Sequence, residues 1–255
     1  MIDGGWKYAA SSVIGTSHQL TPDGVCQDSH LCRYLDGPQP ALLAIVSDGA
    51  GSASHSHIGS RRACEYIDGV LSQAAPSALF TYDFALSVLQ GLQKDLEDMA
   101  MELGLKIREF ACTLLVAIVS SHRAAFWQVG DGAICFRLRS QDIFQYAFWP
   151  EKGDYANMTF FVTDAKAEEH LEFDVTCGEI VELAAFSDGI ERLALDFAAG
   201  AAHSAFFNGL FPHLRTLEPG CSTRVSAQLA GFLGSERVNR RTDDDKTLIL
   251  ASRAL

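Results

Sequence analysis

The sequence predicts an α+β layered fold in a single domain. Its apolar runs and helical patterns come in blocks, whereas a doubly wound parallel sheet would alternate strand and helix regularly. The runs Thr113–Ser120 and Ala124–Val129 are joined by a very short link, which suits an antiparallel hairpin. Most runs are nearly continuous in apolar residues, which is typical of strands buried on both faces or between layers.

The strands are expected at short apolar runs spread along the whole chain. The run Ile134–Leu138 (ICFRL) approaches the alternation of a half-buried strand, and the others are nearly continuous in apolar residues. They are Tyr8–Ile14, Ala41–Ser47, Thr113–Ser120, Ala124–Val129, Ile134–Leu138, Ile180–Phe186 and Thr247–Ala251.

The helices are expected where apolar residues recur at spacings of three and four. Such patterns run through 63–71, 84–103, 206–214 and 225–233. Ser222 follows a Pro-Gly pair and precedes the last pattern, so it is a candidate N-cap.

No Pro/Gly/Ser-rich linker divides the chain, so residues 1–255 are expected to form one domain. The segment 150–178 is the least regular part, polar with scattered aromatic residues. We expect it to form a flap or binding loop.

Composition excludes several classes of protein. The net charge is −12, and the one short basic stretch, 237–241 (RVNRR), abuts an acidic triplet, so it is interpreted as a solvated turn and no nucleic-acid partner is expected. No apolar run reaches the length of about 20 residues that spans a bilayer, and no signal peptide begins the sequence. The 7 cysteines have no CxxC spacing, which favours reduced thiols. We therefore expect a cytoplasmic protein without a membrane partner.

An acid followed by glycine ends three of the apolar runs. These are AIVSDG with Asp48, FWQVGDG with Asp131 and LAAFSDG with Asp188. The acid triplet of TDDDKTLIL, 243–245, lies just before an apolar run, and a further acid, Asp28, lies in CQDS near the N-terminus. A single Asp-Gly pair is common in solvated turns. The repetition instead suggests that several carboxylates share one rim of the sheets.

Carboxylates gathered at one rim would repel one another unless cations lie between them. Hard cations such as Mg²⁺ and Mn²⁺ prefer carboxylate, carbonyl and water oxygens. A phosphate-binding loop is the rival interpretation of DGAGS, but GxxxxGK[ST] and GxGxxG are both absent there. The chemistry of the residues favours a metal site.

The ordered set of motifs resembles the metal-dependent serine/threonine phosphatases of the protein phosphatase 2C family, in their compact bacterial form. The set is GTSHQLTPDGVCQDS, VSDGAGS, CTLLVAIV with VGDGAICFRL, FSDGIERL and DDDKTLILA, and it covers nearly the whole chain. The resemblance implies a four-layer α-β-β-α sandwich with two antiparallel central sheets. It also implies a centre of two Mn²⁺ or Mg²⁺ ions at one edge.

Carried over from the family, the first motif would supply a bridging ligand. Asp48 would bridge both ions, the Gly49 carbonyl would bind one of them, and Asp188 with Asp244 would hold the other. Asp244 is chosen within the triplet because the family pattern acid–acid/Asn–x–Thr/Ser matches 244–247.

Two further acids receive roles from the same resemblance. Asp28 would position or polarise metal-bound water. Asp131 would, together with Asp188, offer a weaker third metal site. The implied activity is hydrolysis of phosphoserine and phosphothreonine in proteins, by water that the two ions activate. The substrate would be a phosphoprotein, the product of a Ser/Thr kinase.

Three departures from the family pattern concern phosphate binding and proton transfer. Gln27 stands where a Glu is frequent, Asp23 where an arginine clamps phosphate, and Ala50 where a histidine is proposed as general acid. His18 in GTSH is a candidate replacement, to contact the phosphate or protonate the leaving group. His55, His57, Arg61 and Arg62 are further candidates that are more simply explained as surface or packing residues.

Two other functions stay open from the sequence. A non-catalytic metal-binding regulatory module would explain the missing histidine and arginine, although the retained acids oppose it. A phosphomonoesterase for a small molecule would share the metal chemistry and differ only in substrate.

Overall fold

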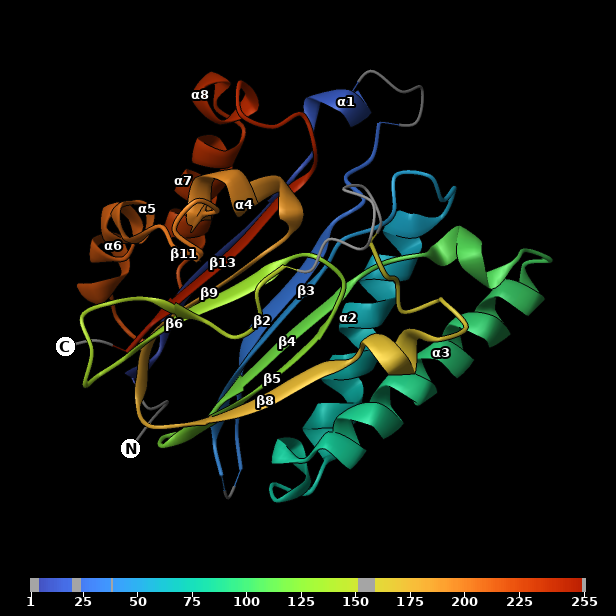
Figure 1. Cartoon of the computed structure of the whole chain (residues 1–255), viewed down its shortest axis with the longest axis horizontal. Coiled ribbons are helices and arrows are strands. Elements are labelled where there is room, and N and C mark those ends of the chain that lie inside the picture. The colour runs from blue at the N-terminus through green and yellow to red at the C-terminus, as the bar shows by residue number, and fades with distance from the viewer. Residues whose placement is uncertain (1–4, 20–23, 38, 151–158, 254–255) are drawn as a thin grey trace.

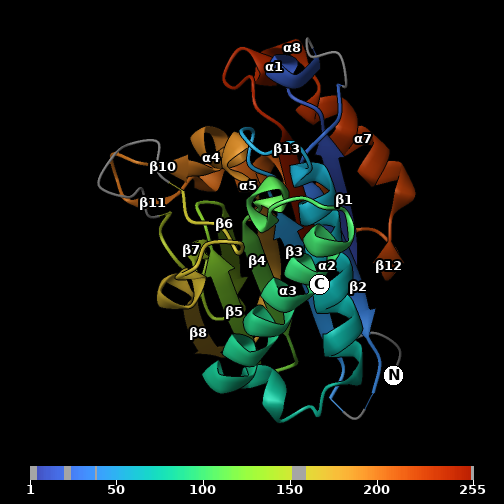
Figure 2. The same cartoon turned by 90° about the vertical axis from the view of Figure 1, so that its right-hand side faces the viewer.

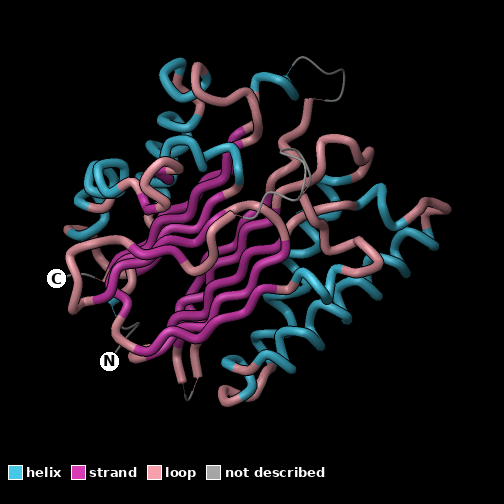
Figure 3. The backbone as a smooth tube through the Cα atoms, viewed as in Figure 1, coloured by secondary structure: helices cyan, strands magenta, loops and turns pink. Residues whose placement is uncertain are grey.

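The computed structural model describes residues 5–19, 24–37, 39–150 and 159–253. Two β-sheets lie face to face, and helices cover the outer face of each (Figure 1). The backbone tube shows the same layers, with the strands stacked between two groups of helices (Figure 3).

One sheet has six strands in the order β12-β1-β13-β9-β6-β7. All neighbours pair antiparallel except the short strand β12, which runs parallel to β1. The strands are β1 Lys7–Val13, β6 Ala133–Leu138, β7 Gln145–Tyr146, β9 Ile180–Phe186, β12 Gly220–Cys221 and β13 Lys246–Ser252.

The other large sheet has five strands in the order β2-β3-β4-β5-β8, all antiparallel. They are β2 Ser29–Leu35, β3 Ala41–Ser47, β4 Leu114–Val119, β5 Arg123–Val129 and β8 Glu172–Cys177. A separate two-stranded ribbon pairs β10 Leu195–Asp196 with β11 Ala201–Ala202.

Two long helices, α2 Ser56–Gln73 and α3 Tyr82–Glu102, cover the five-stranded sheet (Figure 2). The buried residues of α3 recur every three or four positions from Ala85 to Ala100, so one face of the helix turns inward. The remaining α-helices are α1 Thr16–Gln19, α4 Asp188–Ala194, α5 Ser204–Leu210, α6 Pro212–Arg215, α7 Thr223–Leu233 and α8 Glu236–Asn239, and short 3₁₀ turns occupy Ala78–Phe80, Ile107–Phe110 and Ala167–His170.

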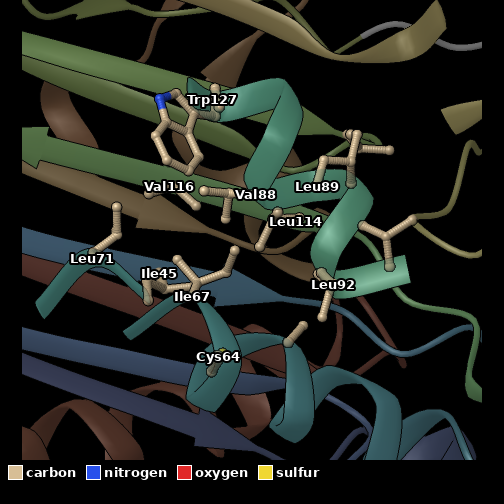
Figure 4. Packing of buried hydrophobic residues seen from close by; sticks show 14 of the residues in the cluster. Ile45, Cys64, Ile67, Leu71, Val88, Leu89, Leu92, Leu114, Val116 and Trp127 are labelled. Carbon is tan, nitrogen blue, oxygen red and sulfur yellow. The ribbon is translucent and has the colours of Figure 1, made fainter. Parts of the chain in front are cut away.

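Three hydrophobic clusters define the layers. The first joins α2 and α3 to the five-stranded sheet, and Ile67, Leu92 and Trp127 all belong to it (Figure 4). The second joins α4–α7 to the six-stranded sheet. The third lies between the sheets and includes Leu42 and Ile249. Complete burial of one such aliphatic side chain contributes about 1.5–3 kcal/mol, and the α-β-β-α order of layers follows from these contacts.

The expected strands are all present, and the hairpin of β4 and β5 is confirmed. Ser222 is the N-cap of α7, as predicted, and its hydroxyl accepts a hydrogen bond from the Val225 amide. The expected helix at 206–214 is instead two, α5 and α6, because Pro212 has no amide to continue the first helix.

Besides four strands of two residues, β7, β10, β11 and β12, two longer strands were not anticipated. Strand β2 is only half-buried along most of its length, and β8 lies at an edge of its sheet, so neither has a continuous apolar run. Strand β8 falls within the segment expected to be a flap, so the end of that segment is regular structure rather than loop. Residues 151–158 lie outside the described residues, and the flap itself stays a prediction.

Candidate metal centre

The predicted acids follow or precede strands at one edge of the two sheets. Because β2 pairs with β3 from Ser29 opposite Ser47, the residues just before β2 and just after β3 lie together. In the other sheet, Phe186 at the end of β9 pairs with Leu248 near the start of β13. Four segments therefore meet at this edge: the turn after β3, the start of α4, and the residues that precede β2 and β13. They carry Asp28, Asp48, Asp188, Asp244 and Asp245.

The turn that carries Asp48 is fixed by its main chain. The Thr113 amide donates to the Asp48 carbonyl at 2.8 Å, and the Ala50 amide donates to the Ala111 carbonyl at 2.9 Å. The Asp48 amide in turn donates to the Thr113 hydroxyl at 2.9 Å. These backbone hydrogen bonds are made by Asp48 and Ala50, the residues on either side of Gly49. The Gly49 carbonyl therefore takes no part in the pairing with residues 111–113.

The glycine that follows an acid permits a close approach of backbone. A Cβ atom on Gly189 would lie 2.0 Å from the Asp245 carbonyl oxygen, and one on Gly49 would lie 2.7 Å from the Gln27 carbonyl oxygen. Any side chain there would push the acid-bearing segments apart. The Asp-Gly pairs are thus explained by packing at this edge, and neither is a free surface turn.

Asp28 links the two sheets. Its side chain is buried, and its Oδ2 accepts a hydrogen bond of 2.7 Å from the Ser187 hydroxyl at the end of β9. The same hydroxyl oxygen accepts a bond of 3.0 Å from the Thr247 amide of β13. Asp28 is therefore held in place by the opposite sheet, with its other oxygen free to face the site.

The carboxyl groups raise one another's pKa. Burial raises the pKa of Asp48 well above its usual range, and the charges of Asp28, Asp188 and Asp244 raise it further. Burial also raises the pKa of Asp188, with the charges of Asp131 and Asp244 adding to it. The pKa of Asp28 is raised by burial and the Asp245 charge, although the Ser187 hydroxyl opposes this. Buried carboxylates so close together favour a positive partner.

Three buried oxygens at this edge accept no hydrogen bond from the described residues. They are Oδ1 of Asp28, Oδ1 of Asp188 and Oε1 of Gln27. Buried polar atoms are normally paired, so these oxygens suit a cation and its waters. Within the described residues, no three His, Cys, Asp or Glu side chains are already arranged as a metal-binding group. The ligand set drawn from the resemblance therefore stays a prediction, while the donor chemistry fits it.

Asp245 is a buried residue of this edge that the sequence did not single out. It is almost fully buried, and its two oxygens accept bonds of 2.6 Å from the amides of Gly15 and Gln27. Its Oδ2 also lies 3.0 Å from Nδ1 of His18. Asp245 thus clamps both N-terminal loops to the start of β13 and holds the ring of His18.

His18, the candidate proton donor, lies near the loop that follows Asp48. Its Nε2 is 3.7 Å from the position that a Cβ on Gly51 would occupy, so the ring faces the loop after Asp48. Ala50 packs into a small apolar cluster with Ala53 and Ala111 and supplies no polar group. Asp23, the other departure from the family pattern, lies outside the described residues.

Two of the other candidate replacements, His55 and Arg62, make contacts that explain them structurally. The ring of His55 packs against Phe110 with centroids 5.5 Å apart, and its Nδ1 lies 2.8 Å from the Ser54 hydroxyl. Arg62 makes two hydrogen bonds to Asp95 of α3, at 2.6 and 2.5 Å. These contacts agree with the simpler interpretation of both residues.

Asp131 lies in the turn between β5 and β6 and is reached by the Thr159 hydroxyl at 2.5 Å. The buried amide of Gln128 holds this turn, donating to the carbonyls of Gly130 and Gly132 at 3.1 and 2.8 Å. Asp131 is close enough to raise the pKa of Asp188, so it belongs to the same edge but sits at its periphery.

Comparison with known proteins agrees with this geometry. Residues 14–234 match the family described as Protein phosphatase 2C. The chain belongs to the protein phosphatase 2C family. Serine/threonine-protein phosphatase 3 of Escherichia coli (strain K12) is 36% identical over 254 residues, which is 96% of this chain and 98% of that protein. This chain is accordingly a protein serine/threonine phosphatase, as the motifs predicted.

Solved structures of phosphatase 2C proteins share the fold. The serine/threonine phosphatase Stp1 from Staphylococcus aureus superposes with a TM-score of 0.62 at 14% identity, over 96% of this chain and 94% of that one. RsbX, solved in complex with magnesium, gives 0.58 at 11% identity, over 99% and 97% of the two chains. The antiparallel α+β architecture predicted from the sequence is confirmed.

The structure also bears on the expected absence of a membrane partner. None of the helices in the described parts of the chain combines the length and apolar character needed to cross a bilayer. The cytoplasmic location expected from the sequence stays a prediction.

Proposed function

We propose that this phosphatase is metal-dependent and that its sheet-edge carboxylates hold two Mn²⁺ or Mg²⁺ ions. Asp48 would bridge the ions, with the Gly49 carbonyl on one of them and Asp188 and Asp244 on the other. The observation that carries the proposal is the group of buried carboxylates with raised pKa values and unpaired oxygens. The magnesium complex of the structural neighbour RsbX supports the choice of a hard cation.

Bound cations would supply Lewis acidity, which lowers the pKa of a coordinated water and offsets the charge of phosphoryl oxygens. The protein's own groups would orient the water and hold the site rigid. Asp28, fixed through Ser187, orients water with its unpaired Oδ1. The buried walls of the edge keep the carboxylates in place, so that little reorganisation is needed during the reaction.

His18 is proposed to protonate the leaving group. Its Nδ1 contacts Asp245, which fixes the orientation of the ring and leaves Nε2 directed toward the loop after Asp48. A carboxylate that contacts one ring nitrogen and orients the ring is a common feature of acid–base histidines. The serine or threonine oxygen of the substrate would take the proton from Nε2.

The substrate is proposed to be phosphoserine or phosphothreonine in a protein, the product of a Ser/Thr kinase. The name of the E. coli relative supports this class. A small phosphorylated molecule would be the alternative. Phosphopeptides and small phosphomonoesters compared at equal concentration distinguish the two, because only the first class should give efficient turnover.

The central test is hydrolysis of a phosphothreonine peptide by protein freed of metal with EDTA and then dialysed. No turnover is expected until Mn²⁺ or Mg²⁺ is added, and Ca²⁺ is expected to substitute poorly because its ligand distances are longer. Phosphate release is the measurement. Full activity in the stripped protein, or none with any divalent ion between pH 6 and 9, would contradict metal dependence.

Replacing Asp131 with Ala should reduce activity only partly, because Asp131 lies at the periphery of the site. The expected loss is about tenfold or less, which corresponds to about 1.4 kcal/mol or less. The bridging group and its neighbours stay intact in this variant. The Mn²⁺ concentration for half-maximal activity should rise. A matched variant, Thr159→Val, removes only the hydroxyl that contacts Asp131. A loss in Asp131→Ala as large as in Asp48→Asn would disprove its peripheral role.

A further inference from the structure

A hollow of about 790 Å³ lies on the helical side of the six-stranded sheet. Helices α4 to α8 surround it, and these helices lie together over the outer face of that sheet (Figure 1). Its volume is within the range of about 300–1,000 Å³ that is typical of small-molecule sites. None of the carboxylates of the candidate metal centre lines it.

The floor of the hollow is apolar. Leu250 of β13 and Leu229 of α7 are buried there, and the partly exposed Phe206 and Phe232 form its sides. A wall of this kind gains free energy by covering an apolar body, in proportion to the area removed from water.

The rim of the hollow is cationic. Arg192 of α4, Arg237 of α8 and Arg241 just beyond α8 line it, and no Asp or Glu does, although the chain has 32 acidic residues. All three arginines are exposed, and none of their guanidinium groups makes a hydrogen bond or ion pair with a described residue. The basic stretch 237–241 is therefore more than the solvated turn expected from the sequence, because two of its arginines face this hollow.

The arginines contrast with the others on the same surface. Arg240, between two of them, pairs with Glu236, and Arg215 pairs with Glu182. Guanidinium groups left without a carboxylate beside an apolar wall are suited to an anionic head group, which they bind with charge-assisted hydrogen bonds.

We propose that this hollow binds one small amphipathic anion, a molecule with a phosphate or carboxylate head group and an apolar body. The head group would lie against the three arginines and the body on the leucine and phenylalanine floor. The complementary charge, the apolar floor and the volume of a single ligand all favour this occupant over a second copy of the chain or a long peptide.

Octyl phosphate is the probe, titrated calorimetrically into the full-length protein in EDTA, so that its phosphate cannot be held through a divalent cation. One binding site is expected. Inorganic phosphate has only the anionic head group, and 1-octanol has only the apolar body. Each should bind at least about tenfold more weakly than octyl phosphate. Octylamine, with the same body and opposite charge, should not bind.

Two kinds of variant separate head group from body. The double variant Arg192→Gln/Arg241→Gln should weaken octyl phosphate about tenfold or more, the size expected for lost charge-assisted bonds. Gly209→Leu should abolish binding with the arginines intact, because a Cβ on this lining residue meets nothing within 4 Å and a leucine would extend into open space. Arg224→Gln is the matched control, an exposed arginine on α7 that does not line the hollow.

Circular dichroism and thermal melting establish that each variant is folded. The proposal is overturned if octyl phosphate does not bind, if it binds no better than octanol, or if neither the arginine pair nor Gly209→Leu weakens it. Sedimentation in the absence of ligand gives a further outcome that overturns it: a dimer dissociated by Gly209→Leu would show that a second copy fills the hollow.

Discussion

Replacing Asp48 with Asn abolishes metal-dependent hydrolysis, with an expected loss of at least about 10³-fold in kcat/KM, since the Lewis acid contributes several kcal/mol. Asn keeps the shape of the side chain but removes the charge proposed to bridge the ions. The raised pKa of Asp48 also shows that its charge is unfavourable in the metal-free protein. Thermal stability in EDTA should therefore be unchanged or higher in the variant.

The matched control for this prediction is Asp243→Asn, an exposed acid of the same triplet whose main chain, rather than its side chain, is bonded to Ser17. It should retain activity close to that of the parent protein. Phosphopeptide turnover over a range of Mn²⁺ concentrations measures both variants. Activity of Asp48→Asn within tenfold of the parent, at saturating Mn²⁺, would rule out a bridging role.

Replacing His18 with Ala is expected to slow phosphoserine hydrolysis by about 10²–10⁴-fold, the usual contribution of a general acid. The same variant should cleave p-nitrophenyl phosphate at nearly the parent rate, because p-nitrophenolate leaves without needing a proton. The physical reason is the position of Nε2 beside Gly51, with Nδ1 held by Asp245.

If a residue only supports the loop, its replacement should lower the hydrolysis rates of both substrates to a similar extent. If His18→Ala slows both substrates equally, His18 positions the loop and is not the proton donor. His57→Ala is the control, since His57 lies at the start of α2 and its ring makes no hydrogen bond with any of the described residues. Its loss should leave both rates unchanged.

Much of the fold was predictable because its central strands are buried on both faces. Strands β3, β4 and β9 are buried at every position, so each appears in the sequence as a continuous apolar run. Strand β2 mixes polar and apolar residues, because it is only partly covered. No local pattern distinguishes such a strand from a loop, and only its pairing with β3 makes it regular.

The acids of the site were predictable for a related reason. An acid-glycine pair after an apolar run marks a strand end, and the repetition of that pair indicates a shared edge. The contacts between segments that are distant in the sequence have no comparable sequence pattern. Asp245 meets His18 across 227 positions of the chain, and Gln128 holds the turn of Asp131 from inside a strand. Which acid of the triplet turns inward depends on the register of β13 against β1.

A crystal structure with Mn²⁺, with anomalous diffraction recorded at the manganese absorption edge, decides whether these carboxylates hold two cations. Two anomalous peaks are expected beside Asp48, one of them also bound by Asp188 and Asp244, and Asp48→Asn should lose at least one. Crystals of active protein in saturating Mn²⁺ with no peak at this edge would contradict the claim.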